Sequence, residues 1–99
     1  MSIRSPKWLV LAALVVATPD TPGVYELWDD DELLQVGATR ESLRKELVHE
    51  LLERESRATH FSWEISFDPT ARERELLAEL RAGREAWPQH MERGRGDNG

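Results

Sequence analysis

The stretch Pro22-Gly-Val-Tyr-Glu-Leu-Trp-Asp-Asp-Asp-Glu-Leu-Leu-Gln-Val-Gly37 decides how the rest of the chain is arranged. It holds two short apolar runs, residues 24–28 and 33–36, separated by the acidic turn from Asp29 to Glu32. Apolar runs of this length around a turn predict a β-hairpin. Because a helical pattern begins soon after Gly37, we expect the hairpin to lead directly into a helix.

Length and composition limit what the chain can be. Ninety-nine residues suffice for one domain with one core, which we place at residues 1–91. Residues 92–99 are predicted to form a mobile tail. The net charge of −6 disfavours a general nucleic-acid binder, because phosphate contacts need an excess of Lys and Arg. The chain has no Cys, which excludes disulfides and thiolate metal sites. A cytoplasmic protein without membrane attachment is the expectation.

The segment from Trp8 to Ala17 allows two interpretations. Ten uncharged residues follow Arg4 and Lys7, an outline that resembles a signal peptide but is too short to cross a bilayer. The alternative is a strand or helix of the core that ends at Pro19. Because cleavage would remove much of the apolar mass of a small domain, the sequence favours the core element.

Two helices and one strand are predicted after the hairpin. Ser42 is a suitable N-cap for a helix with an i, i+4 stripe of Leu43, Leu47 and Leu51. Alternation predicts a half-buried strand over residues 60–67, with His60, Ser62, Glu64 and Ser66 on its polar, solvent side, and a second helix is expected over 70–82. The residues expected on the apolar faces of these two elements are Phe61, Trp63, Ile65, Phe67, Ala71, Leu76, Leu77 and Leu80. The order β, β, α, β, α indicates an α+β domain with a small three-stranded antiparallel sheet flanked by helices.

Short motifs in this order resemble the GIY-YIG nuclease superfamily, which includes the N-terminal nuclease module of a bacterial excinuclease. The motif positions of the hairpin are Gly23, Val24, Tyr25, Gln35, Val36 and Gly37. The helix from Ser42, the acidic helix that carries Glu79, and Pro88 beyond it complete the pattern, which covers residues 21–91. The resemblance implies a GIY-YIG-like fold.

The resemblance also implies a site for hydrolysis of DNA phosphodiester bonds. Tyr25 matches a tyrosine that frames a nucleophilic water, and Glu79 matches the glutamate that holds a single divalent cation, Mg²⁺ or Mn²⁺. The cation and an arginine would neutralise the charge that develops on the phosphoryl oxygens. Aligned by distance from Gln35, Lys45 would take the arginine role and His49 would follow one turn later.

Two departures argue against this chemistry. Gln35 stands where the family has a second tyrosine, and an amide cannot relay a proton as a phenol can. If the helix is aligned by Leu43 and Leu47, Glu46 takes the arginine position and would repel a phosphate. Each matching residue also has a simpler explanation, because Tyr25 suits strand packing, His49 suits a charged surface, and Glu79 suits a solvated i, i+4 pair.

Two hypotheses follow from the resemblance and its departures. The first is a catalytically degenerate GIY-YIG-like domain that needs no cofactor and works as a small binding or structural subunit with another protein or assembly. The second is an active, metal-dependent endonuclease that uses Tyr25, Lys45, His49 and Glu79. The degenerate subunit is preferred, because the motif glycines persist, the second tyrosine and the arginine are replaced, and the chain is acidic. The sequence assigns no nucleic-acid-binding residue.

Overall fold

The predicted hairpin forms the centre of an antiparallel sheet in the computed structural model, which describes residues 6–54 and 56–85. Strand β2 spans Gly23–Asp29 and β3 spans Glu32–Thr39, so both strands are longer than the apolar runs alone predict. The turn between them is closed by Asp30 and Asp31, and Asp30 has a φ of 52°. Asp is one of the few non-glycine residues that tolerates this left-handed backbone.

The sheet has four strands in the order β1-β4-β2-β3, and every neighbouring pair is antiparallel. Strand β4, His60–Ile65, pairs with β2, while β1, Trp8–Leu9, pairs with the outer side of β4. The prediction of a three-stranded sheet is therefore wrong by one strand. A strand of two residues is too short to show the alternation by which a strand is recognised.

The segment before the hairpin belongs to the folded unit. After β1 the chain turns into helix α1, Ala12–Val16, whose Val15 is fully buried. Thr18 is buried as well, and its hydroxyl donates a hydrogen bond to the carbonyl of Val15 at 2.7 Å. This segment therefore forms part of the core, as the sequence favours.

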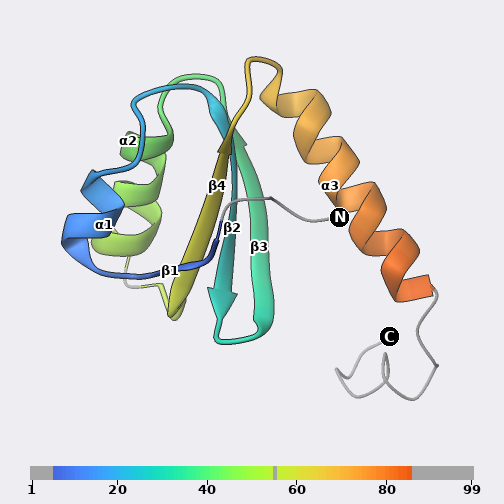
Figure 1. Cartoon of the computed structure of the whole chain (residues 1–99), viewed down its shortest axis with the longest axis horizontal. Helices are drawn as coiled ribbons and strands as arrows, with labels where there is room; N and C mark the ends of the chain where they lie inside the picture. The colour runs from blue at the N-terminus through green and yellow to red at the C-terminus, as the bar shows by residue number, and fades with distance from the viewer. Residues whose placement is uncertain (1–5, 55, 86–99) are drawn as a thin grey trace.

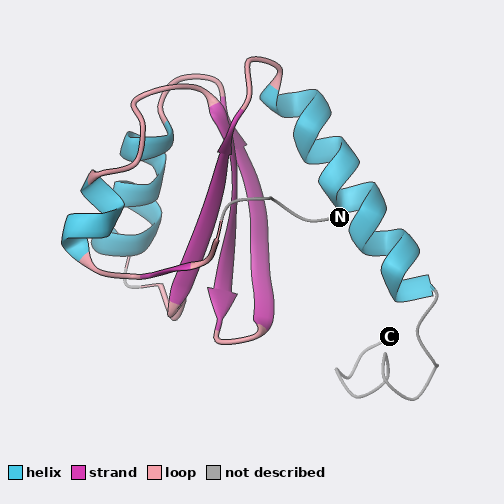
Figure 2. Cartoon of the chain, in the orientation of Figure 1, coloured by secondary structure: helices cyan, strands magenta, loops and turns pink. Residues whose placement is uncertain are grey.

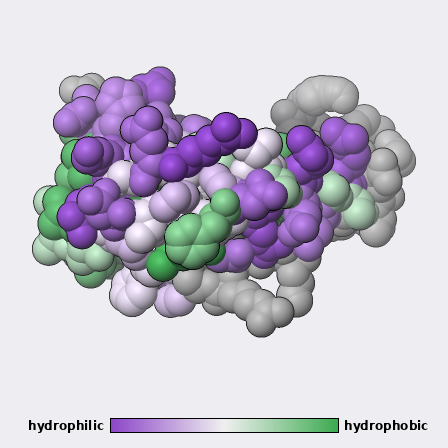
Figure 3. All heavy atoms as spheres, turned by 90° about the horizontal axis from the view of Figure 1, so that it is seen from above, coloured by the Kyte–Doolittle hydropathy of each residue, from purple (hydrophilic) through white to green (hydrophobic). Residues whose placement is uncertain are grey.

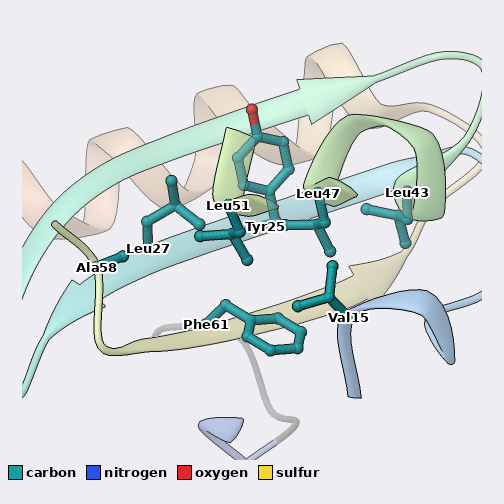
Figure 4. Packing of buried hydrophobic residues seen from close by; sticks show 8 residues of the cluster. All are labelled: Val15, Tyr25, Leu27, Leu43, Leu47, Leu51, Ala58 and Phe61. Atoms are coloured by element: carbon teal, nitrogen blue, oxygen red, sulfur yellow. The ribbon is translucent and has the colours of Figure 1, made fainter. Parts of the chain in front are cut away.

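The helix after the hairpin begins as predicted. Helix α2, Leu43–Leu47, continues into the π-helical segment η1, Val48–Glu53. The Ser42 side chain accepts a hydrogen bond from the backbone N–H of Lys45 at 3.1 Å, which confirms the N-cap. The stripe of Leu43, Leu47 and Leu51 is buried against the sheet together with Tyr25 and Phe61 (Figure 4).

Helix α3, Pro69–Glu85, covers the opposite face of the sheet (Figure 1). Its Leu76 is buried against Val24, and the half-buried Val36 and Ala38 complete this smaller cluster. The expectation that Leu77 faces inward is wrong, because this side chain is exposed. The contact with the sheet is narrow, so α3 buries less apolar surface than its sequence pattern suggests.

Burial around β4 also departs from the predicted alternation. Phe61 is buried and Trp63 half-buried as expected, whereas Ile65 is 43% and Phe67 83% exposed. The strand ends at Ile65, so Phe67 lies in the connection to α3 rather than on the sheet. Ser62, predicted to face solvent, is buried because helices cover both faces (Figure 2).

Some predictions concern residues outside those described. The tail at residues 92–99, the end of the predicted domain at residues 86–91, and the motif proline Pro88 are among them. Within the described residues, every helix is too short or too polar to span a lipid bilayer.

Candidate functional site

Tyr25 lies at the centre of the candidate site, on the sheet face that α2 covers (Figure 4). Its ring crosses from β2 onto the neighbouring strand β3 and lies over Gly37, the residue paired with Tyr25 in the sheet. A Cβ added at Gly37 would overlap the Tyr25 ring and its hydroxyl. The glycine of the second motif is therefore required by the tyrosine of the first.

Gly23, the other motif glycine, is required by close packing as well. A Cβ at this position would overlap the carbonyl oxygen of Glu64 on β4 and the side chain of Leu43 on α2. The absence of a side chain lets the first turn of α2 approach the start of β2. This approach places the face of α2 that follows Leu43 directly over Tyr25.

The hydroxyl of Tyr25 donates a hydrogen bond to Oε2 of Glu46 at 2.9 Å. Glu46 lies on α2 between Leu43 and Leu47, and it is the residue that the alignment by leucines puts at the arginine position. A carboxylate acceptor makes this a charge-assisted hydrogen bond, which is stronger than one between neutral groups. The pair ties the helix to the central strand.

The surroundings of Tyr25 oppose its ionisation. The pKa of Tyr25 is raised above its ordinary value by burial, then by the hydrogen bond to Glu46 and by the negative charges of Glu46, Glu50 and Glu73. The tyrosine is only 2% exposed. It is therefore held as a neutral hydrogen-bond donor in an acidic environment.

Glu50 and Glu73 were not singled out from the sequence. Glu50 follows Glu46 by four residues on the same helix face, a spacing that could have indicated it. It also accepts from Nη1 of Arg54, with an Oε2 distance of 3.2 Å. Glu73 comes from α3, and only the fold brings it within electrostatic range of Tyr25.

The other predicted site residues lie elsewhere. Lys45 is exposed next to Glu46, and His49 is exposed with its Nδ1 at 3.1 Å from Oε1 of Glu53. Glu79 is exposed on α3, six residues beyond Glu73, a distance of about 9 Å along the helix axis. Among the described residues, the Tyr25 hydroxyl donates its hydrogen bond to Glu46, and not to Lys45, His49 or Glu79.

The remaining motif positions support the hairpin. Gln35 is exposed on β3, opposite Leu27 in the sheet register. Val24 and Val36 point to the other face of the sheet, where both contact the cluster around Leu76. Gln35 is two residues before Gly37, which is the residue that the Tyr25 ring covers.

A metal centre has weak support in the described part of the chain. Residues 6–54 and 56–85 contain no group of three or more His, Asp or Glu side chains arranged to hold a metal ion. The resemblance assigns the cation to Glu79, which is exposed and distant along α3 from the carboxylates around Tyr25. The donor set therefore does not fit a divalent cation beside Tyr25.

A second polar cluster lies on the α3 face of the sheet. Ser62 donates to Oε1 of the buried Glu26 at 2.9 Å. Arg72 of α3 donates from Nε and Nη2 to the two carboxylate oxygens of Glu64, at 2.8 and 3.1 Å, and from Nη1 to Glu75 at 3.0 Å. This bidentate pair fixes α3 against β4, and the hydrogen bond to Glu64 raises the pKa of Arg72.

Comparison with known proteins identifies a family without assigning a function. Neither the curated proteins nor the solved structures give a match to this chain. One family model, described as a domain of unknown function, DUF7508, matches residues 1–83. The chain therefore belongs to the DUF7508 family.

Proposed function

We propose that this chain is a catalytically degenerate, GIY-YIG-like domain that works as a small non-catalytic binding or structural subunit. The observation that carries the proposal is the hydrogen bond from Tyr25 to Glu46. In the family that the sequence resembles, an arginine on this helix would face the phosphate. Here a carboxylate takes its place and engages the tyrosine.

The electrostatics of the site support the absence of phosphodiester hydrolysis. A scissile phosphate gains negative charge in the transition state and needs cationic groups or a metal ion beside it. Glu46, Glu50 and Glu73 place negative charge around Tyr25 instead, and this charge adds to the effects of burial and of the hydrogen bond to Glu46 in raising the pKa of Tyr25. Arg44 is a cationic residue two positions before Glu46 on α2. Its Nε donates to the carbonyl of Thr18 at 3.0 Å.

The surface supports a binding role. Exposed large apolar side chains are numerous for so small a protein, and contiguous apolar surface on a monomer marks interaction sites. Those in the segment around β1 and α1 are Trp8, Leu9, Leu11 and Val16. Ile65 and Phe67 are exposed at the end of β4.

The nuclease alternative is tested with the purified full-length protein. We expect no cleavage of labelled single- or double-stranded DNA in the presence of Mg²⁺ or Mn²⁺. Glu79→Ala and the exposed control Glu41→Ala should behave like the wild type. Cleavage by the wild type that Glu79→Ala abolishes and Glu41→Ala preserves would overturn the proposal.

The subunit role is tested separately. The tagged chain is purified under non-denaturing conditions from the cells that express it naturally, and the mass of the isolated particle is measured. Light scattering should give a complex of reproducible composition and of larger mass than the single chain. A persistently monomeric chain without a partner would contradict the subunit role even if the protein cleaves no DNA.

A further inference from the structure

Phe67 is the most exposed large apolar side chain among the described residues, at 83%. It lies in the connection between β4 and α3, at the end of the molecule that Figure 3 shows from above. Ile65, two residues earlier, is also exposed. Exposed apolar groups that gather in this way indicate an interaction surface.

The backbone holds Phe67 in place on both sides. The N–H of Ser66 donates to the carbonyl of Pro22 at 3.1 Å, and the N–H of Asp68 donates to Oγ of Ser66 at 3.2 Å. Asp68 also accepts from the N–H of Ala71 at 3.4 Å, at the first turn of α3. The ring is therefore presented on a hydrogen-bonded turn, which lowers the entropy lost when it is buried in an interface.

A pocket of about 300 Å³ lies beside this ring. Its lining residues are Pro22, Arg40, Phe67, Asp68 and Pro69. One surface thus contains a protruding aromatic ring and a hollow bounded by two prolines. A small molecule in the hollow would leave most of the ring in water, whereas a protein surface with its own protruding ring would cover it.

The charges around the pocket select the partner. Arg40 and Asp68 have opposite signs and sum to zero, although the whole chain carries −6. Among the described residues they form no ion pair with each other, and Arg40 donates to Oγ1 of Thr70 at 3.3 Å. In a twofold dimer, a residue of one copy that contacts a second residue of the other copy has the reverse contact as well. Arg40 of one copy can then face Asp68 of the second, at a locally neutral place on an acidic protein.

We infer that the surface formed by Pro22, Arg40, Phe67, Asp68 and Pro69 binds a second copy of this chain. Phe67 of each copy enters the pocket of the other, and two Arg40–Asp68 pairs flank the rings. This inference extends the proposed subunit role by naming a partner. It uses residues distinct from the Tyr25 site and does not depend on the outcome of the DNA cleavage assay.

Sedimentation of the purified full-length protein tests the inference. The average mass of the wild type should rise from monomer to dimer between about 10 μM and about 1 mM, the range for a small interface. Phe67→Ser should weaken dimerisation about 10-fold or more, because it removes the buried ring. Leu77→Ser, the loss of an exposed apolar side chain on α3 outside this surface, should leave dimerisation unchanged.

Charge reversal identifies the pairing. Arg40→Glu and Asp68→Arg should each weaken dimerisation, and the double variant should recover most of the loss because the pairs form again with reversed polarity. Asp68→Arg also removes the acceptor for Ala71, so the double variant is compared with Asp68→Arg, which has the same defect. A monomer at every concentration, equal effects of Phe67→Ser and Leu77→Ser, or no recovery in the double variant would each overturn the inference.

Discussion

Phe61 and Phe67 are the two phenylalanines of the chain, six positions apart, and they have opposite environments. Phe61 lies on β4 between β1 and β2, opposite Trp8 and Leu27, and is fully buried. Phe67 follows the end of the same strand and projects into solvent. The comparison shows that pairing on both sides, and not the apolar pattern alone, determines which ring joins the core.

The largest expected effect is the difference between these two rings. Phe61→Ala should lower the free energy of unfolding by about 3–5 kcal/mol, because it removes buried contacts and leaves a cavity. Phe67→Ala should change it by less than about 0.5 kcal/mol, as expected for an exposed side chain. Urea unfolding of both variants measures the difference. Similar losses would mean that Phe67 is buried in the isolated protein.

The next effect concerns the Tyr25 region, where packing is tightest. Gly37→Ala should cost about 1–3 kcal/mol, because the new Cβ overlaps the Tyr25 ring and forces a shift. Gln35→Ala, at an exposed position two residues earlier on the same face of the strand, is the control and should have little effect. Thermal unfolding of the two variants is sufficient for the comparison. An unchanged midpoint for Gly37→Ala would show that the ring does not rest on this glycine.

The smallest effect depends on pH. The folded state holds the Tyr25 proton more tightly than the unfolded chain does, because burial and nearby carboxylates raise its pKa above the ordinary 10.0. Above pH 10 only the unfolded chain loses this proton, so the free energy of unfolding should fall as the pH rises. Because a single proton is involved, the fall is at most about 1.4 kcal/mol per pH unit.

This tyrosine can be followed directly, because it is the only one in the chain. Tyrosinate absorbance should appear at a clearly higher pH in the folded protein than in urea. Tyr25→Phe should remove the signal and reduce the loss of stability above pH 10. A folded-state midpoint at the ordinary tyrosine pKa would contradict the buried, hydrogen-bonded geometry.

The sequence predicted the elements whose signals are local. The hairpin, the Ser42 cap and the leucine stripe follow from turn residues, a capping side chain and helical spacing, and all three are observed. The sequence does not indicate strand β1, because two residues are too few to show an alternation of apolar and polar side chains. Alternation places Ser62 toward solvent, because it cannot show that a second helix layer covers the polar face, where Ser62 is in fact buried.

The candidate site was predictable only in part. Alignment by Leu43 and Leu47 puts Glu46 at the arginine position of the motif, but the hydrogen bond from Tyr25 to Glu46 is seen only in the structure. Glu73 could not be found in this way, since its distance from Tyr25 depends on how α3 packs across the sheet. The exposure of Phe67 depends on where β4 ends, a boundary that the apolar pattern runs past.

The contact between Tyr25 and Gly37 has a consequence for the family as a whole. The ring occupies the space that any side chain at position 37 would need. The two positions therefore share one volume, and a larger residue at one is compatible with the fold only alongside a smaller residue at the other. Across DUF7508 sequences, a larger residue at position 37 should therefore occur together with a smaller residue at position 25.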